Sequence, residues 1–212
     1  MKADSTIFYD VDTQRDFLDR GGAMYLPGAD LLVPKLEQIT QLGRDVGARI
    51  VCALDRHLPG DPLLKSGGGK MPDHCIAGTH GEEMIDATRP LSPLTIGDHD
   101  LSAAEIQTLL DYKGELVFDR RKFETLAENA HAHTILRLVL QPFKDIVVYG
   151  VYQETCVDRA IRELVGLGPK LHVVSDAIAV MSGKTVDFFD RWKSEGVDLI
   201  DVEKLKSLML NQ

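Results

Sequence analysis

Apolar residues along this chain gather in short continuous runs rather than alternating strictly with polar residues. The runs of strand length lie at 5–11, 48–55, 115–119, 145–151, 170–176 and 197–201. Parallel strands that are covered by helices on both faces have this continuous apolar character. The pattern therefore predicts a buried sheet of six mostly parallel strands.

Stretches with helical spacing of apolar residues separate these runs. They lie at 28–45, 102–112, 129–141, 155–167, 183–194 and 202–210, and Ser102 with Glu105 forms a capping box at the start of one of them. Regular alternation of strands and helices predicts an α/β fold with a doubly wound sheet. The sequence shows no internal repeat and no second domain boundary, so we expect a single domain over 1–212.

One region breaks the alternation. Residues 58–100 are rich in glycine, proline and aspartate and have no periodicity, as in "LPGDPLLKSGGGKMPDHCIAGTHGEE". Connections this long are uncommon inside a compact domain and are usually functional or disordered. We expect a long active-site loop here.

Composition narrows the possible partners. The chain has 212 residues, 44% of them hydrophobic, and a net charge of −9. This acidic balance disfavours nucleic acid and anionic membrane surfaces as partners, since both require basic patches. No apolar run approaches the roughly 18 residues that a membrane helix needs. The three cysteines form no spaced framework, so we expect a reduced, cytoplasmic chain with free thiols.

Chemically reactive residues follow the predicted strands. Asp12 lies at the end of the first strand, Asp55 and His57 at the end of the second, Lys122 after the third and Cys156 after the fourth. Ligands of open parallel sheets bind at the carboxyl ends of the strands. Any one of these residues is weak evidence, but four successive strands with such residues indicate a site.

Cys156 has two interpretations. A lone cysteine in the first turn of a helix is more often a small buried apolar residue. Alternatively, backbone N–H groups and the helix dipole stabilise a reactive thiolate, and the same N–H groups form an oxyanion hole. A reactive thiol needs a base, and Asp12 and Lys122 are the candidates, since no histidine lies close by in the same segment.

Asp55, His57 and His74 form a second constellation. An extended D-x-H segment projects both side chains to one side, and a loop can bring His74 back to them. One carboxylate and two imidazoles suit Zn²⁺, Fe²⁺ or Mn²⁺. The alternative, that these are ordinary polar loop residues, stays open on the residues alone. We interpret the neighbouring Cys75 as a packing residue.

At these positions the sequence resembles the cysteine hydrolase superfamily that contains nicotinamidases and isochorismatases. The likeness covers nearly the whole chain. "VDTQRDF" (11–17) is similar to the first-strand motif, "LDRH" and "MPDHCIAGTHGEE" to the metal-binding segments, and "GVYQETCV" (150–157) to the nucleophile motif. "GGAMYLPGAD" (21–30) and "VVSDAIA" (173–179) also fit the superfamily pattern.

The resemblance implies a three-layer α/β/α fold and a divalent metal ion held by Asp55, His57 and His74. It implies a cis peptide bond after Val151, and the superfamily commonly forms homo-oligomers. The implied catalytic triad is Asp12, Lys122 and Cys156.

The lysine is the weakest correspondence. "RRKFETLAENA" departs from the aromatic-Ser-Ala-Phe run that follows the lysine in the family, so Arg120 or Arg121 is an alternative. Lys122 is the only lysine in the segment, and we choose it. Asp16 is expected to cap or orient the loop after the first strand.

The metal ligands favour the nicotinamidase branch, because isochorismatases cleave a vinyl ether and generally lack them. The implied reaction converts nicotinamide and water to nicotinate and ammonia in NAD salvage. Phe17, Met71, Val151 and Tyr152 are the expected substrate-binding residues. Met71 stands where nicotinamidases commonly carry tryptophan, and "QET" before Cys156 is also unusual. The alternative is therefore a related hydrolase acting on another small amide or on a vinyl ether.

Overall fold

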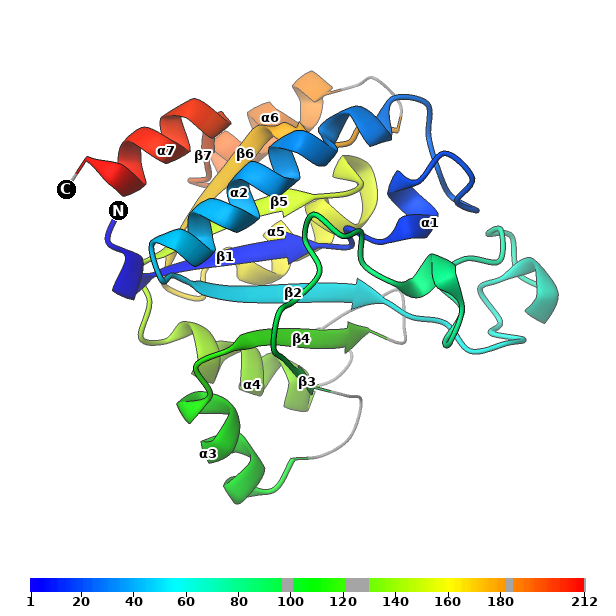
Figure 1. The fold of residues 1–212 in the computed structure, drawn as a ribbon, viewed down its shortest axis with the longest axis horizontal. Helices are drawn as coiled ribbons and strands as arrows, with labels where there is room; N and C mark the ends of the chain where they lie inside the picture. Colours follow the sequence, from blue (N-terminus) through cyan, green and yellow to red (C-terminus); the bar gives the residue numbers. More distant parts are fainter. Residues whose placement is uncertain (97–100, 121–129, 182–184, 212) are drawn as a thin grey trace.

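A parallel sheet of seven strands organises the part of the chain that the computed structural model describes, which is residues 1–96, 101–120, 130–181 and 185–211. The strand order is β3-β4-β2-β1-β5-β6-β7, and all adjacent strands are parallel (Figure 1). The strands are β1 Thr6–Val11, β2 Arg49–Asp55, β3 Pro93–Ile96, β4 Glu115–Arg120, β5 Asp145–Gly150, β6 Lys170–Ile178 and β7 Asp198–Ile200.

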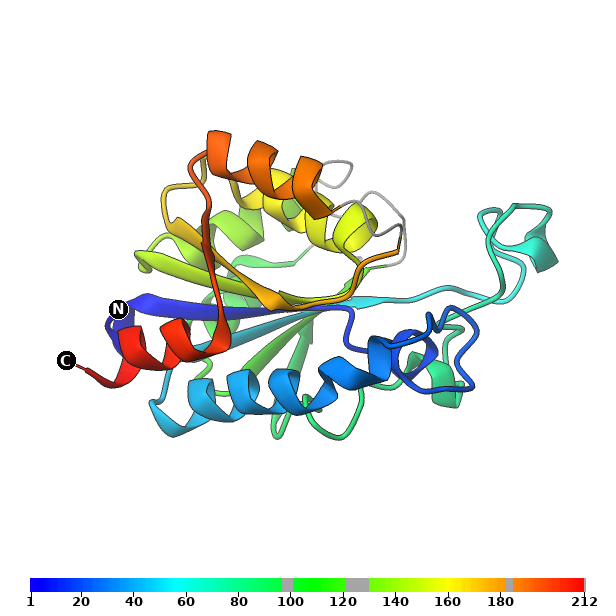
Figure 2. The same ribbon diagram turned by 90° about the horizontal axis from the view of Figure 1, so that it is seen from above.

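Helices cover both faces of this sheet and complete the three expected layers. They are α1 Arg15–Leu18, α2 Val33–Asp45, α3 Ala103–Asp111, α4 Ala130–Leu140, α5 Asp158–Leu164, α6 Thr185–Ser194 and α7 Val202–Leu210. Figure 2 shows α2 and α7 on one face and α4, α5 and α6 on the other. Each face has its own apolar core.

The continuous apolar runs have a simple explanation in β1. Ile7, Tyr9 and Val11 pack into one core, whereas Phe8 packs into the core on the opposite face. All six residues of β1 are buried. Successive side chains of a strand point to opposite faces, so a strand buried on both faces has no polar side to reveal in its sequence.

The sequence predicted six strands, and β3 is the one that it missed. Pro93–Ile96 lies within the predicted loop region, at the edge of the sheet, and exposes two of its four residues. A four-residue edge strand carries no buried apolar run, so only its pairing with β4 reveals it. The capping box is confirmed, with the Ser102 N–H donating to Glu105 Oε2 at 2.8 Å and the Glu105 N–H to Ser102 Oγ at 3.3 Å.

Residues 58–72 project from the carboxyl edge of the sheet as a loop that we name the arm (cyan to teal in Figure 2). Its glycines allow close packing. A Cβ atom on Gly67 would lie 2.0 Å from the carbonyl oxygen of Asp61, and one on Gly69 would lie 2.1 Å from that of Leu63. The glycine-rich composition that suggested disorder therefore reflects backbone segments in direct contact.

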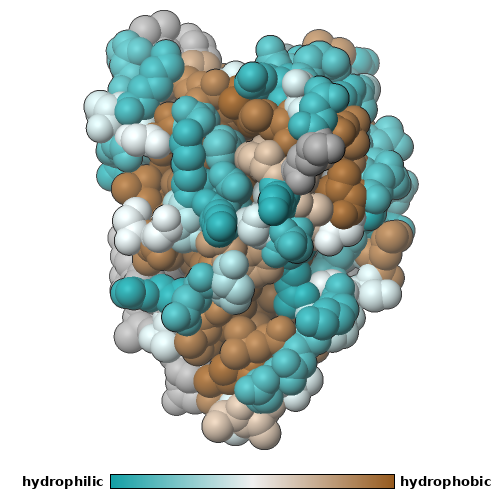
Figure 3. All heavy atoms as spheres, turned by 90° about the vertical axis from the view of Figure 1, so that its left-hand side faces the viewer, coloured by the Kyte–Doolittle hydropathy of each residue, from teal (hydrophilic) through white to brown (hydrophobic). Residues whose placement is uncertain are grey.

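The opposite edge, where the strands begin, holds a cavity of about 290 Å³ lined by Arg44, Lys113 and Glu115 among others. Figure 3 views this side of the molecule, which mixes hydrophilic and apolar side chains. Arg44 Nε donates to Glu115 Oε1 at 2.8 Å, so the main charges of the cavity neutralise each other. The candidate catalytic residues follow the carboxyl ends of the strands, so this cavity is not part of their site.

In the described residues, no helix is both long enough and apolar enough to span a bilayer. The three cysteines are free thiols, as the sequence predicted.

Strand β5 ends in close contact with β1. Gly150 pairs with Val11 and has a φ of 127°, and a Cβ atom at Gly150 would lie 2.0 Å from the Val11 carbonyl oxygen. That oxygen instead accepts a hydrogen bond from the Val151 N–H at 2.9 Å. The contact places Val151, and the segment that follows it, beside Asp12.

We expect Gly150→Ala to destabilise the protein by about 1–3 kcal/mol more than Gly168→Ala, because of the added steric overlap. Gly168 is a matched control, since its φ is 119° but a Cβ there would meet nothing within 4 Å. Both variants incur the strain of a positive φ, and only Gly150→Ala adds the contact with Val11. Equal free energies of unfolding in urea would contradict the proposed role of this contact.

Asp10 is a fully buried carboxyl group near the carboxyl end of β1. It accepts a hydrogen bond from Thr13 Oγ1 at 2.9 Å. Burial raises the pKa of Asp10 well above its ordinary value, and the charges of Asp12 and Glu115 raise it further. The hydrogen bond from Thr13 lowers the pKa but does not cancel these effects. The folded chain therefore holds the Asp10 proton more tightly than the unfolded chain, in which an aspartate ionises at about pH 4.

This raised pKa makes stability fall with pH, since the native state binds the proton more tightly than the unfolded state. The contribution is complete below the unfolded pKa and is lost as the pH rises toward the folded value. We expect Asp10→Asn, which stays neutral, to lose less stability than the wild type between about pH 4 and pH 8. Urea unfolding across this range tests it, with the exposed Asp4→Asn as control; parallel curves for wild type and Asp10→Asn would count against it.

Candidate active site and metal centre

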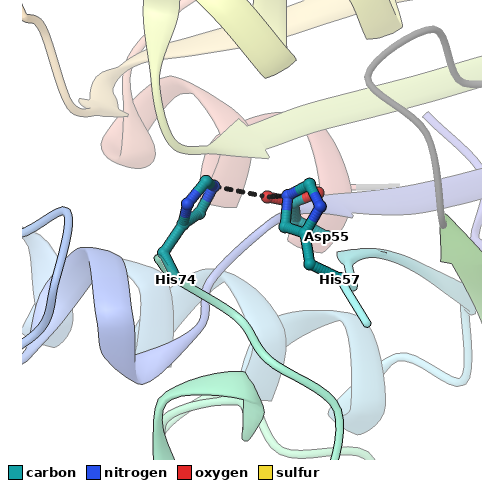
Figure 4. Close-up of side chains that lie close together, drawn as sticks. All are labelled: Asp55, His57 and His74. Atoms are coloured by element: carbon teal, nitrogen blue, oxygen red, sulfur yellow. Dashed lines mark ion pairs between the residues drawn. The ribbon is translucent and has the colours of Figure 1, made fainter. Parts of the chain in front are cut away.

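Asp55, His57 and His74 meet at the carboxyl edge of the sheet, as the sequence predicted (Figure 4). Asp55 ends β2, His57 follows two residues later, and His74 returns after the arm. His74 Nε2 lies 3.1 Å from Asp55 Oδ2, and His57 Nε2 lies 3.4 Å from the same oxygen. All three residues are buried.

Both histidines are oriented by hydrogen bonds on the far side of their rings. His57 Nδ1 lies 3.0 Å from Asp61 Oδ2, and His74 Nδ1 lies 2.7 Å from the carbonyl oxygen of Pro72. In a neutral imidazole, donation through Nδ1 leaves Nε2 with its lone pair. Each Nε2 therefore faces Asp55 as a potential ligand atom.

The residues fit a divalent cation. Ligands at 2.0–2.1 Å from Zn²⁺ in tetrahedral geometry are about 3.4 Å apart, close to the two distances from Asp55 Oδ2. All three ligand atoms lie within 4.8 Å of one another. His57 Nε2 is buried and, although 3.4 Å from Asp55, forms no hydrogen bond. A buried nitrogen without a hydrogen bond is costly in a folded protein, and a bound cation would satisfy it.

The electrostatics of the site also favour a cation. Burial lowers the pKa of His57, but its interactions with the carboxylates of Asp55 and Asp61 outweigh burial and raise the pKa to about 9. His74 is likewise raised, because Asp55 and the Pro72 carbonyl outweigh its burial. The acidic surroundings thus attract positive charge to the two imidazoles.

Gln14 holds Asp55 in place, and the sequence did not single it out. Its Nε2 donates to the Asp55 carbonyl at 2.7 Å, and its Oε1 accepts from the Asp55 N–H at 2.9 Å. The same Nε2 donates to the Glu82 carbonyl at 2.8 Å. The side-chain amide of Gln14 thus pairs with both backbone groups of Asp55, as a neighbouring strand would, and joins the turn after β1 to the end of β2. The only sequence feature that could have identified Gln14 was its place in the motif "VDTQRDF".

Asp16 orients the loop after β1, as expected, and also reaches a distant segment. Its Oδ1 accepts from the Ala23 N–H at 3.0 Å, and its Oδ2 accepts from the Cys75 N–H at 2.7 Å. A Cβ on Gly81 would overlap the same carboxylate at 2.2 Å. Asp16 therefore fixes the residue that follows His74 against the turn after β1.

Asp12 and the turn that carries Cys156 lie at the ends of the adjacent strands β1 and β5. Asp12 is buried with a φ of 51°, and its N–H donates to the Ala53 carbonyl at 3.0 Å. Cys156 is half-buried within a π-helical turn, Gln153–Val157. The Val151–Tyr152 peptide bond before it is cis, which confirms what the resemblance implies.

Cys75 links these residues to the metal ligands. Burial raises the pKa of its thiol, with Asp55, Asp12, Asp16 and Cys156 adding to the effect. Its backbone carbonyl accepts from the His57 N–H, and its N–H donates to Asp16. The fully buried thiol is unreactive, in agreement with its interpretation as a packing residue.

The expected substrate-binding residues fall into two groups. Phe17 packs its ring 5.7 Å from those of His74 and Tyr152, and these two rings and Val151 are buried together. Tyr152 Oη lies 2.8 Å from the Phe17 carbonyl, and burial raises its pKa to about 12, so the phenol stays a donor. Met71 is half-buried in the arm and hydrogen-bonded through its backbone.

Lys122 lies outside the described residues, as does Arg121. Strand β4 ends at Arg120, whose backbone is in register with Asp55. Strand β4 thus ends at the edge of the sheet where Asp55 lies. The catalytic role of Lys122 stays a prediction.

Comparison with known proteins agrees with the fold described above. The model of the isochorismatase domain matches residues 7–204. A zinc complex of the pyrazinamidase of Pyrococcus horikoshii is similar over 93% of this chain and 99% of its own, with 22% identity and a TM-score of 0.71. No curated protein matches the sequence.

Two further solved structures share the fold. PnC1 from L. infantum, in complex with nicotinate, is 17% identical over 96% of both chains, with a TM-score of 0.74. N-carbamoylsarcosine amidase from Thermoplasma acidophilum is 20% identical over 96% of this chain and 98% of its own, with a TM-score of 0.69. The family model, which spans almost the entire chain, shows that this protein belongs to the isochorismatase family of hydrolases.

Proposed function

We propose that this protein is a metal-dependent cysteine amidohydrolase that converts nicotinamide and water to nicotinate and ammonia. The observation that carries the proposal is the meeting of three features at one edge of the sheet. Asp55 ends β2, the buried Asp12 directly follows β1, and the turn bearing Cys156 follows β5; β1 lies between β2 and β5 in the sheet. A metal-binding donor set beside a thiol and a carboxyl group suits hydrolysis of a small amide.

In this mechanism the carboxylate of Asp12 accepts the proton of the Cys156 thiol, and Lys122 stabilises the resulting charges. The thiolate attacks the amide carbon, and backbone N–H groups of the π-helical turn hold the oxyanion. Asp12 returns its proton to the nitrogen as the C–N bond breaks and ammonia leaves. Water then hydrolyses the thioester, which releases the acid and restores the thiol of Cys156.

Asp55, His57 and His74 would hold the metal ion, which acts as a Lewis acid able to bind a pyridine nitrogen or a water molecule. Phe17 packs against His74 and Tyr152, which supports a role as an aromatic wall of the adjacent pocket. The half-buried Met71 of the arm and the buried Val151 are proposed to shape the same pocket.

A second candidate reaction is hydrolysis of a different small amide. The similarity to N-carbamoylsarcosine amidase supports it at much the same level as the similarity to nicotinamidases. The side chains of Gln153, Glu154 and Thr155 directly precede the proposed nucleophile and depart from the nicotinamidase pattern. Gln153 and Glu154 are the residues expected to set the choice of substrate.

Metal-loaded protein should release ammonia from nicotinamide, and Cys156→Ala should abolish turnover without changing metal content. A chelator should remove the activity, and added Zn²⁺ or Mn²⁺ should restore it. Nicotinamide and N-carbamoylsarcosine, assayed in parallel for ammonia, separate the two candidate substrates. Failure to turn over nicotinamide would refute that substrate, whereas activity in Cys156→Ala would refute the nucleophile.

Lys122→Ala should lower kcat by at least about 10²-fold, comparable to the loss of an oxyanion-hole donor, because its charge is proposed to stabilise the thiolate. Arg120→Ala and Arg121→Ala are matched controls from the same segment, and we expect smaller effects from them. The rate of Cys156 alkylation by iodoacetamide against pH provides an independent readout. A larger loss in either arginine variant than in Lys122→Ala would transfer the role to that arginine.

A further inference from the structure

The arm is closed at its base by the metal-binding histidines themselves. His57 directly precedes it, and His74 follows two residues after its end. The His57 N–H donates to the Cys75 carbonyl at 2.9 Å, and the His57 carbonyl accepts from the Ala77 N–H at 2.8 Å. The two chain segments that enter and leave the arm therefore run side by side at the metal site.

Each histidine is oriented by a group from the arm. Pro72, at the end of the arm, accepts from His74 Nδ1 through its backbone carbonyl. Asp61, near the start, contacts His57 Nδ1 through its carboxylate. A backbone carbonyl cannot be removed by substitution, whereas the Asp61 side chain can be. Asp61 is therefore the contact between the arm and the histidines that mutagenesis can test.

Asp61 is integrated into the arm by most of its polar atoms. Its Oδ1 accepts from the Leu63 N–H at 2.9 Å, its N–H donates to the Leu58 carbonyl at 3.1 Å, and its carbonyl accepts from the Leu64 N–H at 2.9 Å. Gly67 packs directly on that carbonyl. Only Oδ2 leaves this local network, and it lies 3.0 Å from His57 Nδ1.

We propose that Asp61 is a positioning residue that holds His57 with Nε2 toward Asp55 and thereby makes metal affinity depend on the fold of the arm. A carboxylate that accepts from Nδ1 selects the tautomer whose Nε2 is free to bind a metal, and fixes the ring plane. The inference rests on the metal-binding part of the proposed function. Beyond that function, it assigns a role to Asp61, which is not one of the three metal-ligand candidates. It also links the geometry of those three residues to the fold of the arm.

Zn²⁺ affinity, measured by competition with a chromogenic chelator, tests this inference without an activity assay. Loss of such a second-layer carboxylate typically weakens metal binding by about 10- to 100-fold. We expect an increase of that size in the dissociation constant for both Asp61→Ala and Asp61→Asn. The asparagine keeps the size of the side chain, so it separates the orienting role from simple packing.

Asp73→Asn is the matched control, because Asp73 Oδ1 accepts from the Ser66 N–H at 3.0 Å and so also supports the arm through a carboxylate. It should leave the Zn²⁺ dissociation constant unchanged. Gly67→Ala, which would push a Cβ against the Asp61 carbonyl, should weaken Zn²⁺ binding although it is remote from the ligands. The ¹⁵N NMR spectrum of the Zn²⁺-loaded wild type should show His57 protonated at Nδ1, and Asp61→Asn should alter this signal.

The outcomes are distinguishable. If the wild type binds Zn²⁺ no better than His57→Ala does, the metal centre of the proposed function fails. If the wild type binds Zn²⁺ and both Asp61 variants bind it equally well, the centre stands and the positioning role is overturned. Equal losses in Asp73→Asn and Asp61→Asn would also overturn that role, since they would assign the effect to the stability of the arm alone. Circular dichroism establishes that each variant is folded.

Discussion

The close approach of β5 to β1 is the contact on which the candidate site depends. Val11 and Gly150 pair at the carboxyl ends of two strands that are far apart in the sequence, and the Val151 N–H bonds to the Val11 carbonyl. A side chain at Gly150 would separate these backbones. Because they touch, Asp12 and the turn with Cys156 begin from neighbouring points in space.

Around this contact, polar side chains form the hydrogen bonds that backbone groups would form in regular secondary structure. Gln14 bonds to both backbone groups of Asp55, and Asp16 accepts the N–H groups of Ala23 and Cys75. A buried backbone group without a partner costs about 1–3 kcal/mol, so irregular segments at a sheet edge need such partners. The residues that support the centre are therefore polar, with Gln14 buried and Asp16 half-buried, and they need not touch a substrate.

The arm extends the same logic away from the sheet. Gly67 and Gly69 let its backbone segments pack on one another, and Asp61 ties this packed unit to His57. A loop that would otherwise be independent of the chemistry thus shares a hydrogen bond with a histidine of the proposed metal site. The orientation of His57 therefore depends on the conformation of the arm through Asp61.

Much of the architecture could be read from the sequence because it depends on local patterns. The continuous apolar runs identified six of the seven strands. Because the carboxyl ends of parallel strands lie at one edge of a sheet, Asp12, Asp55 and His57 could be assigned to that edge. Short motifs indicated His74 and Cys156 because their spacing reflects chemistry. The exposed edge strand β3 has no such pattern, and only its pairing with β4 defines it.

The tertiary structure decided which polar residues support the site. Gln14, Asp61 and the Pro72 carbonyl act through partners that the folded chain brings to them. Composition cannot distinguish a glycine that loosens a loop from one, such as Gly67, that lets two backbones touch. The sequence by itself determined the layers and the reactive residue types, since periodicity and spacing are local. Their mutual orientation depends on contacts between distant segments, and only the fold supplies those.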